Sequence, residues 1–114
     1  LADVLQIRWA KFVPALKQVA TVFENDAELA LANAYLLLDA MGHAVVAWLW
    51  LDQALCAEGL LAQADLSESR RNLLKGKIVA AQYFITWELP TKDSLLERFE
   101  AVDPLCRDVD TEVL

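Results

Sequence analysis

The sequence of 114 residues has few residues that interrupt helices and few that form metal sites or disulfides. It contains three glycines and three prolines, whereas leucine (21) and alanine (18) together supply 39 residues. This composition favours helices and argues against a β protein. Two cysteines without a CxxC pair and a single histidine exclude a zinc finger and a disulfide scaffold. So little cysteine fits a reducing compartment, and we expect a cytoplasmic protein.

Positive charge is also scarce, with 10 Lys and Arg against 17 Asp and Glu, which gives a net charge of −7. A nucleic-acid binder would present a basic face, so we expect no nucleic-acid partner. The hydrophobic content of 57% provides enough apolar surface to offset the entropy of the chain, and it excludes disorder. The sequence starts at Leu1, within a helical pattern and without the features of a signal peptide. We therefore expect a piece of a longer protein.

The first two predicted helices carry long apolar patterns. Over residues 5–23, large apolar residues recur at alternate steps of four and three, which predicts one amphipathic helix. Pro14 lies off this stripe and is expected to kink the helix without breaking the core face. Asn25 and Glu28 have the spacing of a capping box. They predict the start of a second helix over residues 27–61.

The third helix is expected to start at Asp65 or Ser67, either of which can cap it. Pro90 is expected to end it, and Thr91 can then cap a short fourth helix that continues to Val102. The third helix carries two apolar stripes about 100° apart. These stripes are formed by Leu74, Ile78, Ala81 and Ile85, and by Leu73, Ala80, Phe84 and Trp87.

These elements predict an all-α fold, an antiparallel helical bundle of three long helices and one short C-terminal helix. We expect residues 1–102 to form this bundle as a single domain. Residues 103–114 are acidic and begin with Asp103-Pro104, so we expect a frayed tail. No internal repeat, low-complexity tract or Gly/Ser linker divides the chain.

The stretch from residue 29 to residue 51 is apolar except for Asn33, Asp39 and His43, so a membrane span has to be considered. An aspartate in the middle of a span costs about 2.5–3.5 kcal/mol on insertion scales. No basic cluster flanks the stretch, and helical rotation gathers Asp39 and His43 into one strip. We therefore favour the central helix of a soluble bundle, and a peripheral membrane module remains an alternative.

Asp39 and His43 lie four residues apart, where a carboxylate can orient an imidazole for general-base catalysis. No nucleophile accompanies them at helical spacing, and no second histidine or acidic ligand completes a metal site. The ordinary interpretation is a polar pair at a helix contact. The three glycines are isolated, so there is no phosphate-binding loop. We predict no catalytic, cofactor-binding or metal-binding residue in the chain.

Basic residues cluster in the first half of the third helix, where they oppose the helix dipole. These residues can bind a phosphate group or an acidic surface, although a basic cluster of this kind more commonly faces solvent without a partner. The cluster consists of Arg70, Arg71, Lys75 and Lys77.

The sequence contains four tryptophans, and an aromatic residue contributes more buried area than any other residue type. Trp9 and Trp87 lie on apolar stripes, and Trp48 points away from the polar strip of the second helix, so we predict that all three are buried in the core. Trp50 shares its strip with Asp39 and His43, and we therefore expect it to contact another domain or subunit. The predicted interface residues are Trp50, Arg70 and Lys77.

Two parts of the sequence carry a resemblance to a known family. One reads NAYLLLDAMGHAVVAWLW, from Asn33 to Trp50, and the other comprises Lys75-Gly-Lys77, Ala81-Gln-Tyr83-Phe84 and Glu88-Leu89-Pro90. They resemble the helical domain at the extreme C-terminus of many bacterial acyl-CoA dehydrogenases. Within that group the chain looks most like the large enzymes that include methylmercaptopropionyl-CoA dehydrogenases. The resemblance extends from the first helix to Pro90.

The resemblance implies a parent enzyme that uses FAD to remove two hydrogens from an acyl-CoA thioester. In that family a glutamate removes the α-proton and flavin N5 accepts the β-hydride, but no position here matches either the catalytic glutamate or a flavin contact. The chain would then pack on the preceding catalytic domains and help to form a homo-oligomer. The alternative is a stand-alone helical interaction or oligomerisation domain without catalytic activity.

Overall fold

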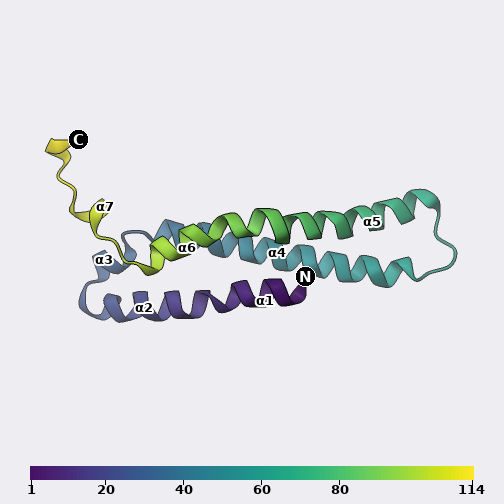
Figure 1. The fold of residues 1–114 in the computed structure, drawn as a ribbon, viewed down its shortest axis with the longest axis horizontal. Coiled ribbons are helices and arrows are strands. Elements are labelled where there is room, and N and C mark those ends of the chain that lie inside the picture. Colours follow the sequence, from purple (N-terminus) through teal and green to yellow (C-terminus); the bar gives the residue numbers. More distant parts are fainter.

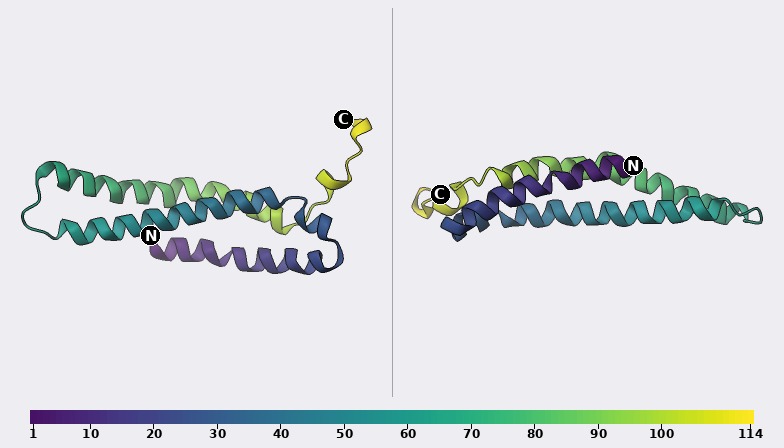
Figure 2. Two further views of the ribbon diagram at one scale, coloured as in Figure 1. Left: turned by 180° about the vertical axis from the view of Figure 1, so that it is seen from behind. Right: turned by 90° about the horizontal axis from the view of Figure 1, so that it is seen from below.

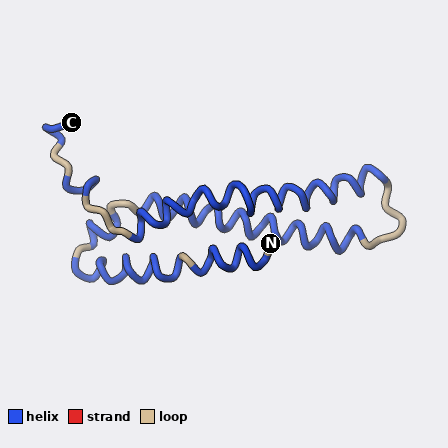
Figure 3. The backbone as a smooth tube through the Cα atoms, viewed as in Figure 1, coloured by secondary structure: helices blue, strands red, loops and turns tan.

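The computed structural model describes residues 1–114 and contains helices but no strand (Figure 3). This confirms the predicted all-α class. The predicted set of three long helices and one short helix is not reproduced, because two of the predicted helices are divided. The elements are α1 (Ala2–Ala10), α2 (Phe12–Asn25), α3 (Ala27–Leu31), α4 (Ala34–Leu61), α5 (Glu68–Tyr83), the π-helix η1 (Phe84–Glu88), the 3-10 helix η2 (Leu89–Lys92), α6 (Asp93–Glu100), α7 (Leu105–Asp108) and the 3-10 helix η3 (Thr111–Val113).

The first predicted helix is divided at Lys11 into α1 and α2. Pro14 has no N–H, and its ring would collide with the carbonyl of Ala10 in an uninterrupted helix. The backbone N–H of Lys11 instead bonds to the carbonyl of Arg8, three residues back, at 3.1 Å. Proline therefore interrupts the helical hydrogen bonding at Lys11, whose φ of −69° and ψ of −22° remain helical. Leu5, Phe12 and Val19 on the two sides of this point share one core, which confirms that the core face is unbroken.

The second predicted helix is divided by a turn that ends at Asn33. The cap of α3 is Asp26, whose side chain accepts the N–H of Leu29 at 3.0 Å, so the predicted cap at Asn25 is wrong by one residue. Asn33 is buried, and its side chain donates to the carbonyl of Asp103 at 3.1 Å. This bond to a residue distant in sequence stabilises the break between α3 and α4.

The prediction that Pro90 ends the third helix is wrong. The helical path continues through η1 and η2 into α6. The chain widens into a π-turn, in which the N–H of Leu89 bonds to the carbonyl of Phe84, five residues back. Pro90 then lies at the start of η2, where its missing N–H costs no hydrogen bond. The Thr91 hydroxyl does not cap a helix and donates to the carbonyl of Glu88 at 2.6 Å.

Helices α4 and α5 form a long antiparallel hairpin, and α1 and α2 run along the first half of α4 (Figure 1). At that end α6 packs against both α2 and α4. The far half of the hairpin projects beyond the start of α1 and consists of two helices only (Figure 2). Ser67 caps α5 by accepting the N–H of Arg70 at 3.2 Å, which confirms one of the two predicted caps.

The hydrophobic core lies where α1, α2, α4 and α6 come together. Alanines on one face of α4 allow the neighbouring helices to approach closely, and two phenylalanines fill the space between them. The core comprises Leu5, Phe12, Ala15, Val19, Ala30, Leu36, Ala40, Ala44, Ala47, Ile85, Leu89, Leu96 and Phe99.

The molecule is long and thin for its size. Its radius of gyration is 19.5 Å, whereas a compact domain of this length has about 13 Å. Its accessible surface is 7653 Å², against about 6,200 Å² for a typical monomer of the same mass. Only 18 of 114 residues are buried. The accessible surface of the chain is therefore about 1,400 Å² larger than that of a typical monomer of this mass.

The segment after α6 leaves the bundle through Val102, whose φ of 52° is uncommon for a β-branched residue. Arg107 in α7 then pairs with Asp26 at 2.5 Å and with Asp108 at 2.6 Å. These ion pairs connect the beginning of the predicted tail to the start of α3. Fraying of the acidic tail remains a prediction.

Candidate functional site

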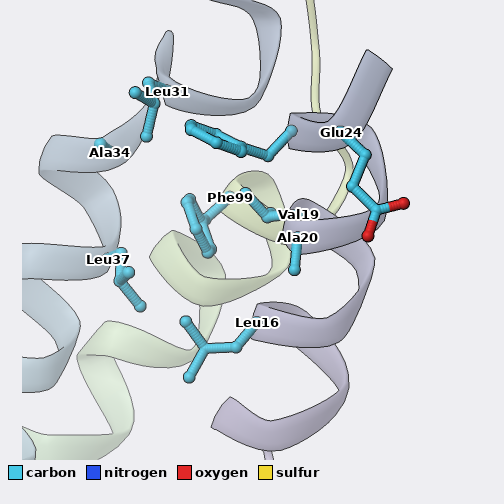
Figure 4. Close-up of a pocket in the computed structure, with 9 residues that line it drawn as sticks. Leu16, Val19, Ala20, Glu24, Leu31, Ala34, Leu37 and Phe99 are labelled. Carbon is cyan, nitrogen blue, oxygen red and sulfur yellow. The ribbon is translucent and has the colours of Figure 1, made fainter. Parts of the chain in front are cut away.

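An apolar groove of about 460 Å³ opens between α2 and the start of α4 (Figure 4). The ring of Phe99 from α6 lies at its base, and the carboxylate of Glu24 points away from it. Eight of its nine lining residues are hydrophobic, so it can accept apolar side chains but offers no acid–base chemistry. The lining residues are Leu16, Val19, Ala20, Phe23, Glu24, Leu31, Ala34, Leu37 and Phe99.

The outward face of α4 is apolar and uncovered. Leu38 is 76% exposed and Trp48 is 56% exposed, so the prediction that Trp48 is buried is wrong. The core-facing positions of α4 are occupied by small residues such as Ala44 and Ala47, and the bulky indole one position further on lies outside. By length and composition α4 can cross a membrane, and only 22% of its most apolar window is buried in the chain. The core helix of a soluble protein passes the same test.

Two other tryptophans lie in contrasting environments. Trp9 packs against the core, with its ring centroid 5.5 Å from that of Phe12, as predicted. Trp87 is 71% exposed, so its predicted burial is wrong. Of the two apolar stripes predicted for the third helix, the one with Leu74 and Ile85 is buried, whereas Leu73 and Trp87 on the other face solvent. A helix carrying two apolar stripes can bury only one of them against a single neighbour.

Two of the three predicted interface residues meet across the hairpin. The ammonium group of Lys77 lies over the ring of Trp50, 5.5 Å from its centroid. Trp50 is half-buried beneath it. Arg70 is exposed, makes no ion pair and lies about two turns away from Lys77 along α5. The cation–π pair joins α4 to α5, and contact of the three residues with a partner remains a prediction.

The predicted polar pair is part of a larger cluster. The Asp39 carboxylate lies 3.1 Å from Nδ1 of His43 and 3.3 Å from the ammonium group of Lys92. The imidazole stacks on Phe84, with the centroids 6.0 Å apart. Lys92 could not be found from the sequence, because it lies 53 residues from Asp39 and no local pattern connects them. No hydroxyl or thiol of a nucleophile joins the cluster, so its geometry favours a contact between α4 and η2.

The hydroxyl of Tyr83 donates to the Glu88 carboxylate at 2.9 Å, beside the π-turn. This hydrogen bond raises the pKa of Tyr83 above its ordinary value, and the negative charge of Glu88 adds to the effect. The phenol donates this bond across the junction and so links α5 to η1.

The residues of the chain do not fit a flavin. All three glycines lie inside helices, so no glycine-rich turn is available for a pyrophosphate. The largest groove lacks the polar groups that would orient an isoalloxazine ring. No group of three His, Cys, Asp or Glu side chains is placed to hold a metal ion.

The fold defines an all-α domain, with a small core at one end and apolar faces left uncovered. A family model described as acetyl-CoA dehydrogenase C-terminal like matches residues 1–110. The chain belongs to this family. No curated protein and no solved structure matches the chain. The resemblance to a C-terminal domain of acyl-CoA dehydrogenases is thereby confirmed at the level of the family.

Proposed function

We propose that this chain is the C-terminal helical domain of an FAD-dependent acyl-CoA dehydrogenase and that it packs on the catalytic body or a subunit interface of that enzyme. The observation that carries the proposal is the family match over residues 1–110, in a chain whose own residues do not fit a flavin. The uncovered apolar groove beside Phe99 and the exposed face of α4 support a packing role, because large exposed apolar patches mark interaction sites.

In this proposal the parent enzyme α,β-dehydrogenates an acyl-CoA thioester, and FAD and the catalytic base belong to its other domains. The chain contributes surface rather than chemistry. We further propose a bacterial, cytoplasmic homo-oligomer of the group that includes methylmercaptopropionyl-CoA dehydrogenases. Trp50, Arg70 and Lys77 are the proposed interface residues, because Arg70 and Lys77 carry charges with no ion-pair partner in the chain.

The second candidate is a stand-alone helical interaction domain without an enzyme attached. The same uncovered apolar surface supports it, since such a surface takes a separate protein as readily as a catalytic body. The reading frame that encodes this chain separates the two candidates. A dehydrogenase body encoded in the same frame supports the first, and its absence supports the second.

The proposal predicts that the chain alone neither retains FAD nor oxidises acyl-CoA. The purified chain is mixed with FAD and gel-filtered, and flavin absorbance is measured in the protein peak. Turnover of acyl-CoA thioesters is followed with a dye acceptor. Flavin that stays with the chain, or turnover above the protein-free control, would contradict the proposal that FAD binding and catalysis belong to the other domains of the enzyme.

A further inference from the structure

A pocket of mixed chemistry lies at the end of the molecule where the tail leaves the bundle (Figure 1). The start of α4, the end of α6 and the start of α7 form it, and its volume is about 300 Å³. Five of its eight lining residues are hydrophobic, and the other three are Asn33, Arg98 and Asp103. An apolar surface with a few polar groups is the usual composition of a small-molecule site, and this volume is at the lower end of the usual range.

The two charged groups of the pocket have opposite signs, and the chain pairs neither of them. Nε of Arg98 donates to the carbonyl of Ser94 at 3.2 Å, and its two terminal nitrogens make no hydrogen bond or ion pair. Oδ1 of Asp103 accepts the N–H of Leu105 at 2.8 Å, and no cation of the chain pairs with this carboxylate. The pocket therefore offers a guanidinium fork and a carboxylate to a ligand.

Asn33 adds a free acceptor in a buried position. Its side chain is part of a residue that is only 8% exposed, and Nδ2 donates to the carbonyl of Asp103 at 3.1 Å. Its carbonyl oxygen Oδ1 receives no hydrogen bond from the chain and is not sealed off from the surface. Polar atoms of buried residues are normally paired, so this oxygen points to a donor from outside the chain.

The wall of the pocket includes the one strained turn of the backbone. Val102 has a φ of 52°, a conformation that is strained for a β-branched residue. Its neighbours Ala101 and Asp103 both line the pocket. Residues in such conformations persist where the surrounding structure holds them, and they concentrate at sites that bind ligands. The turn at Val102 therefore agrees with a ligand site in this place.

We infer that this pocket binds a free α-amino acid with an apolar side chain. The guanidinium of Arg98 receives the α-carboxylate, because its planar fork matches a carboxylate. The α-ammonium group donates to the Asp103 carboxylate and to Oδ1 of Asn33. The side chain packs on Leu36, which is 5% exposed, and on Leu105, which is 68% exposed in the chain by itself.

The two opposite charges favour a zwitterion over other ligands. A simple carboxylic acid would pair with Arg98 but would leave Asp103 and the acceptor of Asn33 without a partner. An amine would do the reverse. A terminus of a polypeptide carries only one of the two charges, so a free amino acid fits the pocket better than a peptide end. The inference goes beyond the proposed function, which assigns no ligand to this end of the molecule.

The test is a titration of the ¹⁵N-labelled chain with L-leucine, followed by amide chemical shifts. We expect saturable shifts confined to residues 33–36 and 98–106. Two analogues of leucine serve as ligand controls: 4-methylpentanoate lacks the ammonium group and 3-methylbutylamine lacks the carboxylate. Each should bind at least about tenfold more weakly than leucine, because a hydrogen-bonded charge is lost.

Variants test the assigned contacts. Arg98→Gln should weaken leucine binding about tenfold or more, and so should Asp103→Asn, which keeps an acceptor for the N–H of Leu105. Arg71→Gln is the matched control, because Arg71 also has no ion-pair partner but lies on α5 near the far end of the molecule (Figure 1). It should bind leucine as the wild type does. Circular dichroism checks that each variant keeps its helices.

If a variant loses helicity, the comparison of leucine with its two analogues decides the question on the wild-type chain alone. Absence of shifts up to the solubility of leucine overturns the inference. So do equal affinities for leucine and either analogue, shifts centred outside the pocket, or full binding by folded Arg98→Gln. None of these results bears on whether the reading frame encodes a dehydrogenase body.

Discussion

Phe99 and Trp48 are both large aromatic residues, yet they occupy opposite environments. Phe99 is 3% exposed at the base of the groove, and Trp48 lies outside the bundle. Phe99→Ala should lower the free energy of unfolding by about 3–5 kcal/mol, because it opens a cavity in a small core. Trp48→Ala should change it by less than about 1 kcal/mol. Urea denaturation measures both, and comparable losses would show that Trp48 is covered in solution.

Asp26 provides a pH-dependent contact. The N–H of Leu29 and the guanidinium of Arg107 lower the pKa of this carboxyl below its usual value. A carboxyl whose pKa is lower in the folded state stabilises the fold fully above its unfolded pKa, about 4, and loses that contribution as the pH falls through its folded pKa. Asp26→Asn keeps a capping acceptor but removes the charge. The free energy of unfolding, measured between pH 2 and pH 6, should therefore depend less on pH in the variant than in the wild type. An equal dependence on pH in both proteins would refute the assignment.

The hairpin depends on how α5 begins. Ser67 accepts the N–H of Arg70, whereas Ser69 is exposed within the first turn and forms no side-chain hydrogen bond. Ser67→Ala should cost about 1 kcal/mol, the usual value of an N-cap. Ser69→Ala is the matched control and should change stability by less than about 0.5 kcal/mol. Thermal melts compare the two, and equal effects would place the cap elsewhere, with Asp65 as the alternative.

The whole molecule is an open shape, because one end of the hairpin has no third helix. The chain, as a monomer at high dilution, should give a radius of gyration near 19.5 Å in small-angle X-ray scattering. The compact bundle of the same length would give about 13 Å. A value close to the compact one would mean that the projecting part of the hairpin folds back on the core in solution.

Features that depend on local chemistry could be read from the sequence. The all-α class follows from abundant leucine and alanine with few glycines and prolines, and the cap at Ser67 follows from its place before an apolar pattern. The breaks beside Pro14 and at Asn33 were less predictable. A proline can either kink or end a helix, and Asn33 is held by the carbonyl of Asp103, seventy residues away.

The sequence by itself determined which faces of each helix are apolar, and its match to a family model over residues 1–110 identified the family. Only the tertiary structure decided which of these faces are buried. Each helix carries more apolar surface than its neighbours in the chain cover, so the pattern alone does not distinguish the core face from an exposed apolar face. Leu74 and Leu73 illustrate this, because they are adjacent and equally apolar, yet one is buried and the other is 58% exposed. Packing against α4 determines which face of α5 is buried.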